Sequence, residues 1–278
     1  MLKRIITAIV ATIAILPALI FSDTFIFPLA VAAATFICVY EMAHCVGKSK
    51  DFALTVPLYV GALVFPFMVR YFDLTIVAIV GFMSVVAYTI YVFALTIWSH
   101  GKLLYKDACS LTLMEFYIIV AMSMLVYIRD FGEYGGYIYL LAFIGAWITD
   151  IFAYFTGVFF GKHKLIEDVS PKKTIEGSIG GTVFCSLGFV VLGLIADIFG
   201  GANANIVFLA IGGIIVAVIS QIGDLIMSVV KRHYGIKDYG WMFPGHGGML
   251  DRVDSLLAVS LAMGAICMFS YVTGIPLM

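Results

Sequence analysis

Long apolar runs dominate this sequence and determine the class of fold that it can adopt. Of its 278 residues, 63% are hydrophobic and 12% are charged, whereas only about 45–50% of a soluble globular domain is apolar. A helix needs about 20 consecutive apolar residues to cross the roughly 30 Å hydrocarbon core of a bilayer. The sequence therefore predicts about nine transmembrane helices. The runs that meet the requirement lie at about 5–22, 25–46, 53–71, 74–98, 108–128, 137–160, 178–199, 205–230 and 255–275.

The pattern within these runs distinguishes between the two kinds of membrane-spanning fold. A transmembrane β-barrel shows short segments in which apolar and polar residues alternate. These runs are instead long, continuous and rich in Leu, Ile, Ala, Val and Phe. We therefore predict an all-α, polytopic membrane protein. Lys3 and Arg4 before the first run also fit a signal peptide, but no A-x-A-type cleavage site follows, so we expect this helix to be retained.

The basic residues predict the orientation of the helices, because cytoplasmic loops of membrane proteins carry an excess of Lys and Arg. If the N-terminus is cytoplasmic, Arg70 and Arg129 are the only two of the 16 basic residues that fall in loops on the opposite side. We therefore expect a multi-pass protein of the cell (inner or plasma) membrane. Its N-terminus is expected in the cytoplasm and its C-terminus outside.

The chain divides into two parts of different character. Residues 1–135 hold five mostly plain apolar helices, which we expect to form an N-terminal membrane scaffold. Residues 136–278 place polar and Gly-rich segments at the cytoplasmic ends of four helices, and we expect this part to be catalytic, with cytoplasmic loops at 161–177 and 231–254. No clean internal repeat is visible, which argues against a transporter built from inverted repeats.

The eighth apolar run carries polar and ionisable groups at helical spacing. Ser220, Asp224 and Ser228 recur every four residues. Lys231 follows seven residues after Asp224, so the four side chains share one helix face. The serines also fit a stripe of interhelical hydrogen bonds. Asp224 differs from them, because an acid within an apolar run is costly without a partner, and we interpret it as functional.

A Gly-rich loop precedes the ninth run, in the sequence PGHGGMLDRVDS at 244–255. Gly245, Gly247 and Gly248 let backbone N–H groups approach a ligand closely. Free N–H groups at the start of a helix suit phosphate, so we expect this loop to contact substrate. His246 between the glycines could act as a base or a metal ligand, but no second histidine stands at metal-binding spacing.

Two aspartates begin the ninth run. Asp251 and Asp254 lie three residues apart on one face of its first turn, with Arg252 between them. They could cap the helix and pair with Arg252. Acid pairs beside an anion-binding loop also make sense if Mg²⁺ bridges them to phosphates, because this ion prefers oxygen ligands. We favour the second interpretation.

The region between the sixth and seventh runs adds an acid and two cations. Asp150 lies among apolar residues, and we expect it to have a functional or a pairing role. The segment SPKKTIEGSIGG at 170–181 places Lys172 and Lys173 before a Gly-rich helix start. These cations fit contacts with anionic lipid headgroups as well as with substrate phosphates, and the sequence leaves both interpretations open.

Two further acids, Glu41 and Glu115, lie within apolar runs. Neither belongs to a motif. Each could pair with a neighbouring helix, and we predict a structural role for both.

Taken in order, these segments resemble the signature of the phosphatidate cytidylyltransferases, also called CDP-diacylglycerol synthases. The resemblance is carried by S-x-x-G-D-L-x-x-S-x-x-K-R-x-x-x-x-K-D at 220–238 and P-G-H-G-G-x-L-D-R-x-D-S at 244–255. Two upstream segments are similar to other landmarks of that family: D-x-x-A-Y-x-x-G-x-x-F-G-K-H-K at 150–164 and S-P-K-K-T-x-E-G-x-x-G-G at 170–181. The resemblance covers the C-terminal half strongly and the first five helices by topology alone.

The resemblance implies an enzyme that transfers the cytidylyl group of CTP to phosphatidate, giving CDP-diacylglycerol and pyrophosphate for phospholipid biosynthesis. It also implies a requirement for Mg²⁺, with a second cation left open. We expect Asp224 and Asp251 to bind the metal, with Asp254 or Asp150 completing or orienting the site. The predicted catalytic residues are Asp224, Asp251, Lys231 and Arg252. The predicted substrate contacts are Ser220, Ser228, Arg232, Lys172, Lys173, Gly245, His246, Gly247, Gly248, Asp150 and Asp254.

The expected partners are CTP, a phosphatidate lipid and the bilayer, with an active site that faces the cytoplasm. No nucleic acid is expected, and a homodimer is left open. A related CTP-dependent membrane enzyme that acts on an isoprenoid or polyprenyl substrate is the alternative of the same class. An ion-coupled transporter is the alternative from a different class, although the acids cluster at helix ends rather than at the membrane midplane.

Overall fold

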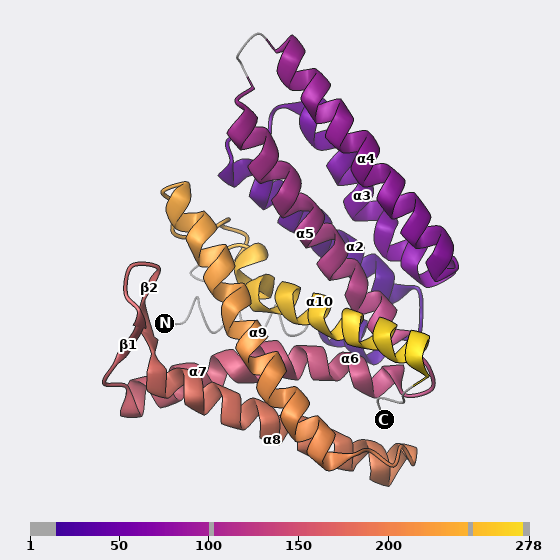
Figure 1. Cartoon of the computed structure of the whole chain (residues 1–278), viewed down its shortest axis with the longest axis vertical. Helices are drawn as coiled ribbons and strands as arrows, with labels where there is room; N and C mark the ends of the chain where they lie inside the picture. Colours follow the sequence, from indigo (N-terminus) through magenta and orange to yellow (C-terminus); the bar gives the residue numbers. More distant parts are fainter. Residues whose placement is uncertain (1–14, 100–102, 244–246, 275–278) are drawn as a thin grey trace. The chain divides into compact units, whose positions relative to one another are not determined.

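The computed structural model describes residues 15–99, 103–243 and 247–274, and these are almost entirely helical (Figure 1). The helices are α2 (Ile26–Cys45), α3 (Phe52–Tyr71), α4 (Leu74–Trp98), α5 (Tyr105–Arg129), α6 (Gly135–Phe143), η1 (Ile144–Ile148), α7 (Thr149–Phe160), α8 (Ile175–Gly200), α9 (Ile206–His233) and α10 (Leu250–Thr273). Between α7 and α8 lies a hairpin of two antiparallel strands, β1 (Lys164–Ile166) and β2 (Ser170–Thr174).

Eight helical stretches in the described part of the chain are long and apolar enough to cross a membrane. They correspond to the second to ninth predicted runs, and the sixth run consists of α6, η1 and α7 in unbroken succession. The prediction of an all-α, polytopic membrane protein is confirmed. Most of the first predicted run, 5–22, lies outside the described residues, and the orientation of the helices stays a prediction.

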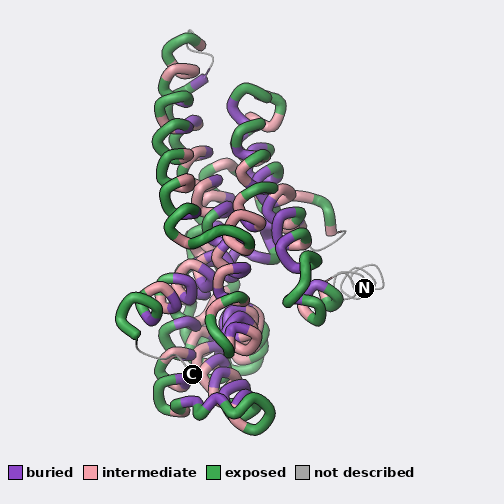
Figure 2. Tube along the Cα trace, turned by 90° about the vertical axis from the view of Figure 1, so that its right-hand side faces the viewer, coloured by how far each residue is buried: buried purple, intermediate pink, exposed green. Residues whose placement is uncertain are grey.

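Large apolar side chains on the outer helix surfaces indicate that these helices are surrounded by lipid. Phe82, Ile90 and Phe199 are among many that are exposed, and Figure 2 shows exposed residues along the sides of several helices. A soluble monomer rarely exposes contiguous apolar patches of more than a few hundred Å². In a bilayer the same side chains meet lipid tails, so they are at no disadvantage there.

The described chain forms two compact units. Unit 1 consists of the described parts of Met1–Tyr127 and Tyr234–Arg252, and unit 2 of those of Ile128–His233 and Val253–Met278. We assigned the segment from Tyr234 to Arg252 to the C-terminal half. Its described residues make their contacts mainly with the N-terminal helices and therefore belong to unit 1. The functional division between a scaffold and a catalytic half stays a prediction.

In unit 1, α3 packs against both α2 and α4. Helix α3 contains Pro57, which has no N–H to donate to the carbonyl of Ala53 four residues earlier. The hydroxyl of Tyr91 on α4 donates to this carbonyl at 2.9 Å. Next to it, the hydroxyl of Tyr88 donates to the carbonyl of Leu54 at 2.8 Å. The tyrosines of α4 thus satisfy backbone acceptors of α3, which matters in a bilayer because its core offers no water as a substitute.

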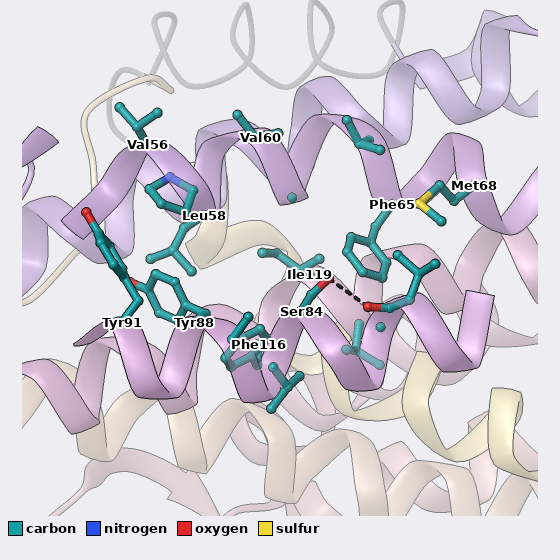
Figure 3. A pocket seen from close by; sticks show the side chains of 18 residues that line it. Val56, Leu58, Val60, Phe65, Met68, Ser84, Tyr88, Tyr91, Phe116 and Ile119 are labelled. Atoms are coloured by element: carbon teal, nitrogen blue, oxygen red, sulfur yellow. Dashed lines mark hydrogen bonds between the residues drawn. The ribbon is translucent and has the colours of Figure 1, made fainter. Parts of the chain in front are cut away.

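An apolar cavity of about 600 Å³ lies between α3, α4 and α5 of unit 1 (Figure 3). Figure 3 shows Phe65, Phe116 and Ile119 turned towards it. The hydroxyl of Ser84 donates to the carbonyl of Val80 in its own helix at 2.7 Å. Since none of the described lining residues is charged, this cavity suits hydrocarbon rather than a phosphate-bearing ligand, and we do not assign it to the candidate site.

In unit 2, α7 packs against α8 and α8 against α9. The first pair approaches so closely that a Cβ added at Gly177 would lie 2.6 Å from the carbonyl oxygen of Ala153. Between α6 and α7 the helix widens into the π-helical stretch η1. Within it, Gly145 leaves no room for a Cβ beside Val216 of α9. Such stretches frequently occur at functional sites, and Asp150 follows this one within the first turn of α7.

The link between α3 and α4 gives a stability prediction. The variant Tyr91→Phe removes the donor to the Ala53 carbonyl and cannot be compensated by Pro57. Because interhelical hydrogen bonds in membrane proteins average about 0.6 kcal/mol and reach about 1.7 kcal/mol, we expect a loss of stability in this range. Unfolding of the purified protein by SDS titration measures it. Tyr71→Phe is the control, since no hydrogen bond of that hydroxyl occurs among the described residues, and an equal loss in both variants would contradict the assignment.

Candidate active site

The polar cavity of unit 2 is the strongest candidate for an active site. It has a volume of about 520 Å³ and lies between α7, the β1–β2 hairpin, α8 and α9. Its charged lining residues are Asp150, Lys164, Lys172, Lys173 and Asp224. A cavity that gathers three cations and two carboxylates is unusual between membrane helices, because charged groups there are costly unless they are paired or hydrated.

An ion pair joins the hairpin to α9 in this cavity. The Nζ atom of Lys173 lies 2.5 Å from Oδ2 of Asp224. The other carboxylate oxygen of Asp224 accepts a hydrogen bond from the hydroxyl of Ser228 at 3.4 Å. The two charged side chains are mostly buried, with exposed fractions of 24% and 23%. Asp224 thus pairs with one of the two lysines of the SPKK segment, and its predicted functional role stays a prediction.

The hairpin itself brings the other two lysines to the cavity. Lys164 on β1 pairs in register with Thr174 on β2, and its Nζ atom donates to the carbonyl of Pro171 at 2.5 Å. Lys172 also lies in β2 and lines the cavity. The segment at 161–177, which we expected to be a loop, thus contains an antiparallel hairpin, and three lysines of this hairpin line the cavity.

Two interactions hold the hairpin against the start of α8. The hydroxyl of Thr174 accepts a hydrogen bond from the N–H of Gly177 at 3.1 Å and so caps the helix. The carboxylate of Glu176 accepts hydrogen bonds from the N–H groups of Lys162 at 3.1 Å and His163 at 3.2 Å. It also contacts Nδ1 of His163 at 2.7 Å. Because these contacts join the chain before β1 to the chain after β2, they close the hairpin at its base.

A second charged group lies at the contact of α7, α9 and α10 in unit 2. Lys231 and Asp254 approach each other, with 4.0 Å between Nζ and Oδ2, and each side chain is 11% exposed. The hydroxyl of Ser255 donates to Oδ2 of Asp150 at 2.8 Å. Asp254 also lies close enough to Asp224 and Asp150 for the carboxylates to repel one another. Three predicted acids of unit 2 therefore share one region, with lysines as counterions.

The start of α10 belongs to unit 1 and has its own carboxylates. Oδ2 of Asp251 accepts hydrogen bonds from the N–H groups of Tyr239 at 2.8 Å and Gly248 at 2.9 Å. Gly247 beside it has a φ of +82°, which an L side chain rarely adopts. The N–H of Gly248, which we had expected to face substrate phosphates, is thus bound by a carboxylate of the protein.

The remaining predicted residues have varied surroundings. The hydroxyl of Ser220 is buried, with no hydrogen-bond partner among the described residues. Arg232 and Arg252 are exposed, the first in unit 2 and the second in unit 1. Gly245 and His246 lie outside the described residues. The roles predicted for these residues stay predictions.

The predicted metal ligands are divided between the two units, since Asp251 lies in unit 1 and Asp224 and Asp254 lie in unit 2. Among the described residues, no three His, Cys, Asp or Glu side chains gather as a metal-binding group. In unit 2 the counterions of Asp224 and Asp254 are lysines. Metal binding by these three carboxylates therefore stays a prediction.

Several residues at these sites were missed or undervalued in the sequence analysis. Lys164 entered the sequence analysis only within the family-like segment at 150–164, and no pattern of the sequence places it at the cavity. For Glu41 we predicted a structural role and a possible pairing with a neighbouring helix, and its carboxylate indeed accepts hydrogen bonds from Met249 and Leu250 at the start of α10. Glu115 is fully buried, and neither of its carboxylate oxygens has a hydrogen-bond partner among the described residues.

Comparison with known proteins identifies the family of this chain. A family model described as the cytidylyltransferase family matches residues 2–270, so the chain belongs to this family. A phosphatidate cytidylyltransferase of Staphylococcus haemolyticus is 39% identical over 176 residues, which are 63% of this chain and 65% of that relative. A phosphatidate cytidylyltransferase of Staphylococcus aureus is 38% identical over 183 residues, which are 66% of this chain and 68% of that relative. The match to the first relative thus spans a little less than two thirds of its length.

The hydrogen bonds of Glu176 at the base of the hairpin give a prediction. In Glu176→Ala the N–H groups of Lys162 and His163 lose their acceptor, so we expect faster hydrogen–deuterium exchange between residues 162 and 174. Mass spectrometry of the full chain in detergent micelles measures it. Glu167→Ala is the matched control, because Glu167 is an exposed glutamate of the same connection. Equal exchange in the two variants would show that Glu176 does not hold the hairpin.

Proposed function

We propose that this protein is a membrane nucleotidyltransferase that uses CTP and phosphatidate to make CDP-diacylglycerol and pyrophosphate. Membership of the cytidylyltransferase family and the printed names of the relatives support the reaction class. The observation that carries the proposal is the cavity of unit 2, where Lys164, Lys172 and Lys173 meet Asp224 between apolar helices. Both proposed substrates are rich in phosphate and one is a lipid, so a cationic cavity in a membrane protein suits them.

The chemistry requires little activation of the nucleophile. An anionic oxygen of the phosphatidate phosphate attacks the α-phosphorus of CTP. The new bond joins that oxygen to the α-phosphorus, and the bond from the α-phosphorus to the bridging oxygen of the β-phosphate breaks, so pyrophosphate leaves. The protein must therefore bring two anions together, neutralise their charge and align them.

The lysines of the cavity are suited to this task. Lys173 would exchange its contact with Asp224 for a phosphate oxygen, and Lys172 and Lys164 would hold further oxygens from the same hairpin. Because Glu176 joins the two ends of the hairpin, the backbone that carries these lysines is held in place before substrate binds. Preorganised positive charge stabilises a transition state more than charge that must move into position.

The carboxylates of unit 2 suit Mg²⁺ in their donor chemistry. Asp150, Asp224 and Asp254 offer only oxygen atoms, which this ion prefers, and the mutual repulsion of these acids favours a cation between them. From the sequence resemblance we propose Asp224, Asp251 and Asp254 as ligands of Mg²⁺, and Asp150 as the residue that orients the site. When bound, the ion would neutralise phosphate charge and polarise the reacting phosphoryl group.

We also propose that the site faces the cytoplasm of the cell, with the N-terminus on the same side. CTP is available there, and the distribution of Lys and Arg supports this orientation. A cysteine-labelling experiment on intact cells and on inverted vesicles would test it, with introduced cysteines in the β1–β2 hairpin and at the C-terminus. Labelling of the hairpin from outside intact cells would refute the orientation.

A single assay tests the proposed reaction. The purified chain is incubated with labelled CTP, Mg²⁺ and either phosphatidate, an isoprenoid-ether phosphate or a polyprenol, and the lipid products are separated. We expect a labelled CDP-lipid with phosphatidate, and its loss on chelation of the metal. A product with an isoprenoid substrate alone would support the alternative enzyme of the same class, and no product with any lipid would refute the proposal.

The charged residues of the cavity give a prediction for catalysis. Because each phosphate contact stabilises charge in the transition state, we expect Lys173→Met to lower kcat by about 10²–10³-fold. Asp224→Asn is expected to abolish Mg²⁺-dependent transfer while the protein stays folded. Lys106→Met, which removes an exposed lysine of α5, is the control and should keep full activity. Wild-type turnover in purified Asp224→Asn would contradict the role of this residue.

A further inference from the structure

Glu41 makes a contact that links the second helix of the chain to the last one. It lies near the end of α2, and its side chain is buried. Its two carboxylate oxygens accept hydrogen bonds from successive backbone N–H groups, those of Met249 at 3.0 Å and Leu250 at 2.8 Å. Leu250 is the first residue of α10. The first N–H groups of a helix have no partner within the helix, so Glu41 supplies from α2 what a capping residue normally supplies locally.

The same helix start is bound by a second carboxylate. Asp251, itself in the first turn of α10, accepts hydrogen bonds from the N–H groups of Tyr239 and Gly248. Three successive donors, at residues 248 to 250, therefore point at acidic oxygens. Glu41 and Asp251 are close enough to repel each other, and the positive end of the helix dipole together with charge-assisted hydrogen bonds offsets this repulsion.

Two glycines between α9 and α10 approach the carboxylate of Glu41 closely. A Cβ added at Gly240 or at Gly248 would overlap the carboxylate oxygens of Glu41. Glycine at these two positions allows the backbone to close around the carboxylate from both sides. Gly240 and Gly248 thus both lie against one side chain of α2, and all three residues belong to unit 1.

We propose that Glu41 is a positioning residue for nucleotidyl transfer: it fixes the start of α10 and thereby holds the carboxylate of Asp251 in place. The inference rests on the proposed function, in which Asp251 is a metal ligand. It deepens that function by adding a residue from the N-terminal helices, 210 positions before Asp251 in the sequence. It also implies that the N–H groups of residues 248 to 250 serve to orient acids rather than to bind the triphosphate.

The first arm of the test measures the contact without any activity. Hydrogen–deuterium exchange is followed in the full-length protein in detergent micelles, for the wild type, Glu41→Gln and Glu41→Ala. Glu41→Gln keeps the shape of the side chain but presents an amide N–H₂ to one of the two donors, and Glu41→Ala removes both acceptors. We expect amides between residues 239 and 250 to exchange about tenfold faster or more, because hydrogen bonds to charged acceptors are strong. Glu115→Gln, the same change at a buried glutamate of unit 1, should leave these amides unchanged.

The second arm measures catalysis as a function of Mg²⁺ concentration at fixed CTP and phosphatidate. Residues that orient a metal ligand typically affect metal affinity or activity by about 10–100-fold when mutated. We therefore expect Glu41→Gln to weaken the apparent affinity for Mg²⁺, or to lower kcat, by this amount. Glu115→Gln is expected to keep the wild-type response to Mg²⁺.

The two arms test the contact of Glu41 and its positioning role separately. Wild-type exchange rates in Glu41→Gln, which keeps the shape of the side chain and does not depend on the alanine variant folding, would refute the contact. Faster exchange with unchanged turnover and Mg²⁺ response would refute the positioning role. If the wild type transfers no cytidylyl group, the proposed function fails, and the exchange arm still decides whether Glu41 holds the start of α10.

Discussion

The compensation of buried charge is the constraint on which the arrangement of this chain depends. A charged carboxylate between apolar helices needs a cation, a hydrogen-bond donor or a metal ion, because the bilayer offers no water to replace them. Lys173 fulfils this need for Asp224, and Lys231 approaches Asp254. For Glu41 the donors are backbone N–H groups of a distant segment. These polar contacts join the hairpin to α9, α9 to α10, and α2 to the start of α10. The other contacts between the helices are mostly apolar.

The sequence was sufficient to predict the helices, because hydropathy alone predicts membrane spans well. Helix α4 at Leu74–Trp98 has the bounds that we expected, and α9 differs from its predicted run by only a few residues. Asp224 could be singled out for the same reason, since an acid in an apolar run has few explanations. Of the two interpretations that the sequence left open for Lys172 and Lys173, contact with substrate phosphates fits their position in the same cavity as Asp224.

What the sequence could not predict depends on pairings between distant segments. The β1–β2 hairpin is too short and too polar to show a strand pattern, and the contacts of Glu176 that join its two ends come from the start of α8. Glu41 lies in an ordinary apolar helix, and its partners follow more than two hundred residues later. No spacing rule connects such positions. The interpretation of the Gly-rich loop as a phosphate cradle also rested on its amides being available, whereas Asp251 binds one of them.

The π-helical stretch between α6 and α7 determines the direction in which Asp150 points. A π-helical stretch contains about one residue more than the α-helix that it replaces, and each residue turns an α-helix by about 100°. All side chains of α7 are therefore rotated about the helix axis relative to those of α6, and the rotation brings Asp150 to Ser255. Shortening Ile144–Ile148 by a single residue would restore a regular helix and swing this carboxylate by about a quarter turn away from α10. The number of residues in η1, which contains no charged side chain, thus determines towards which neighbouring helix Asp150 points.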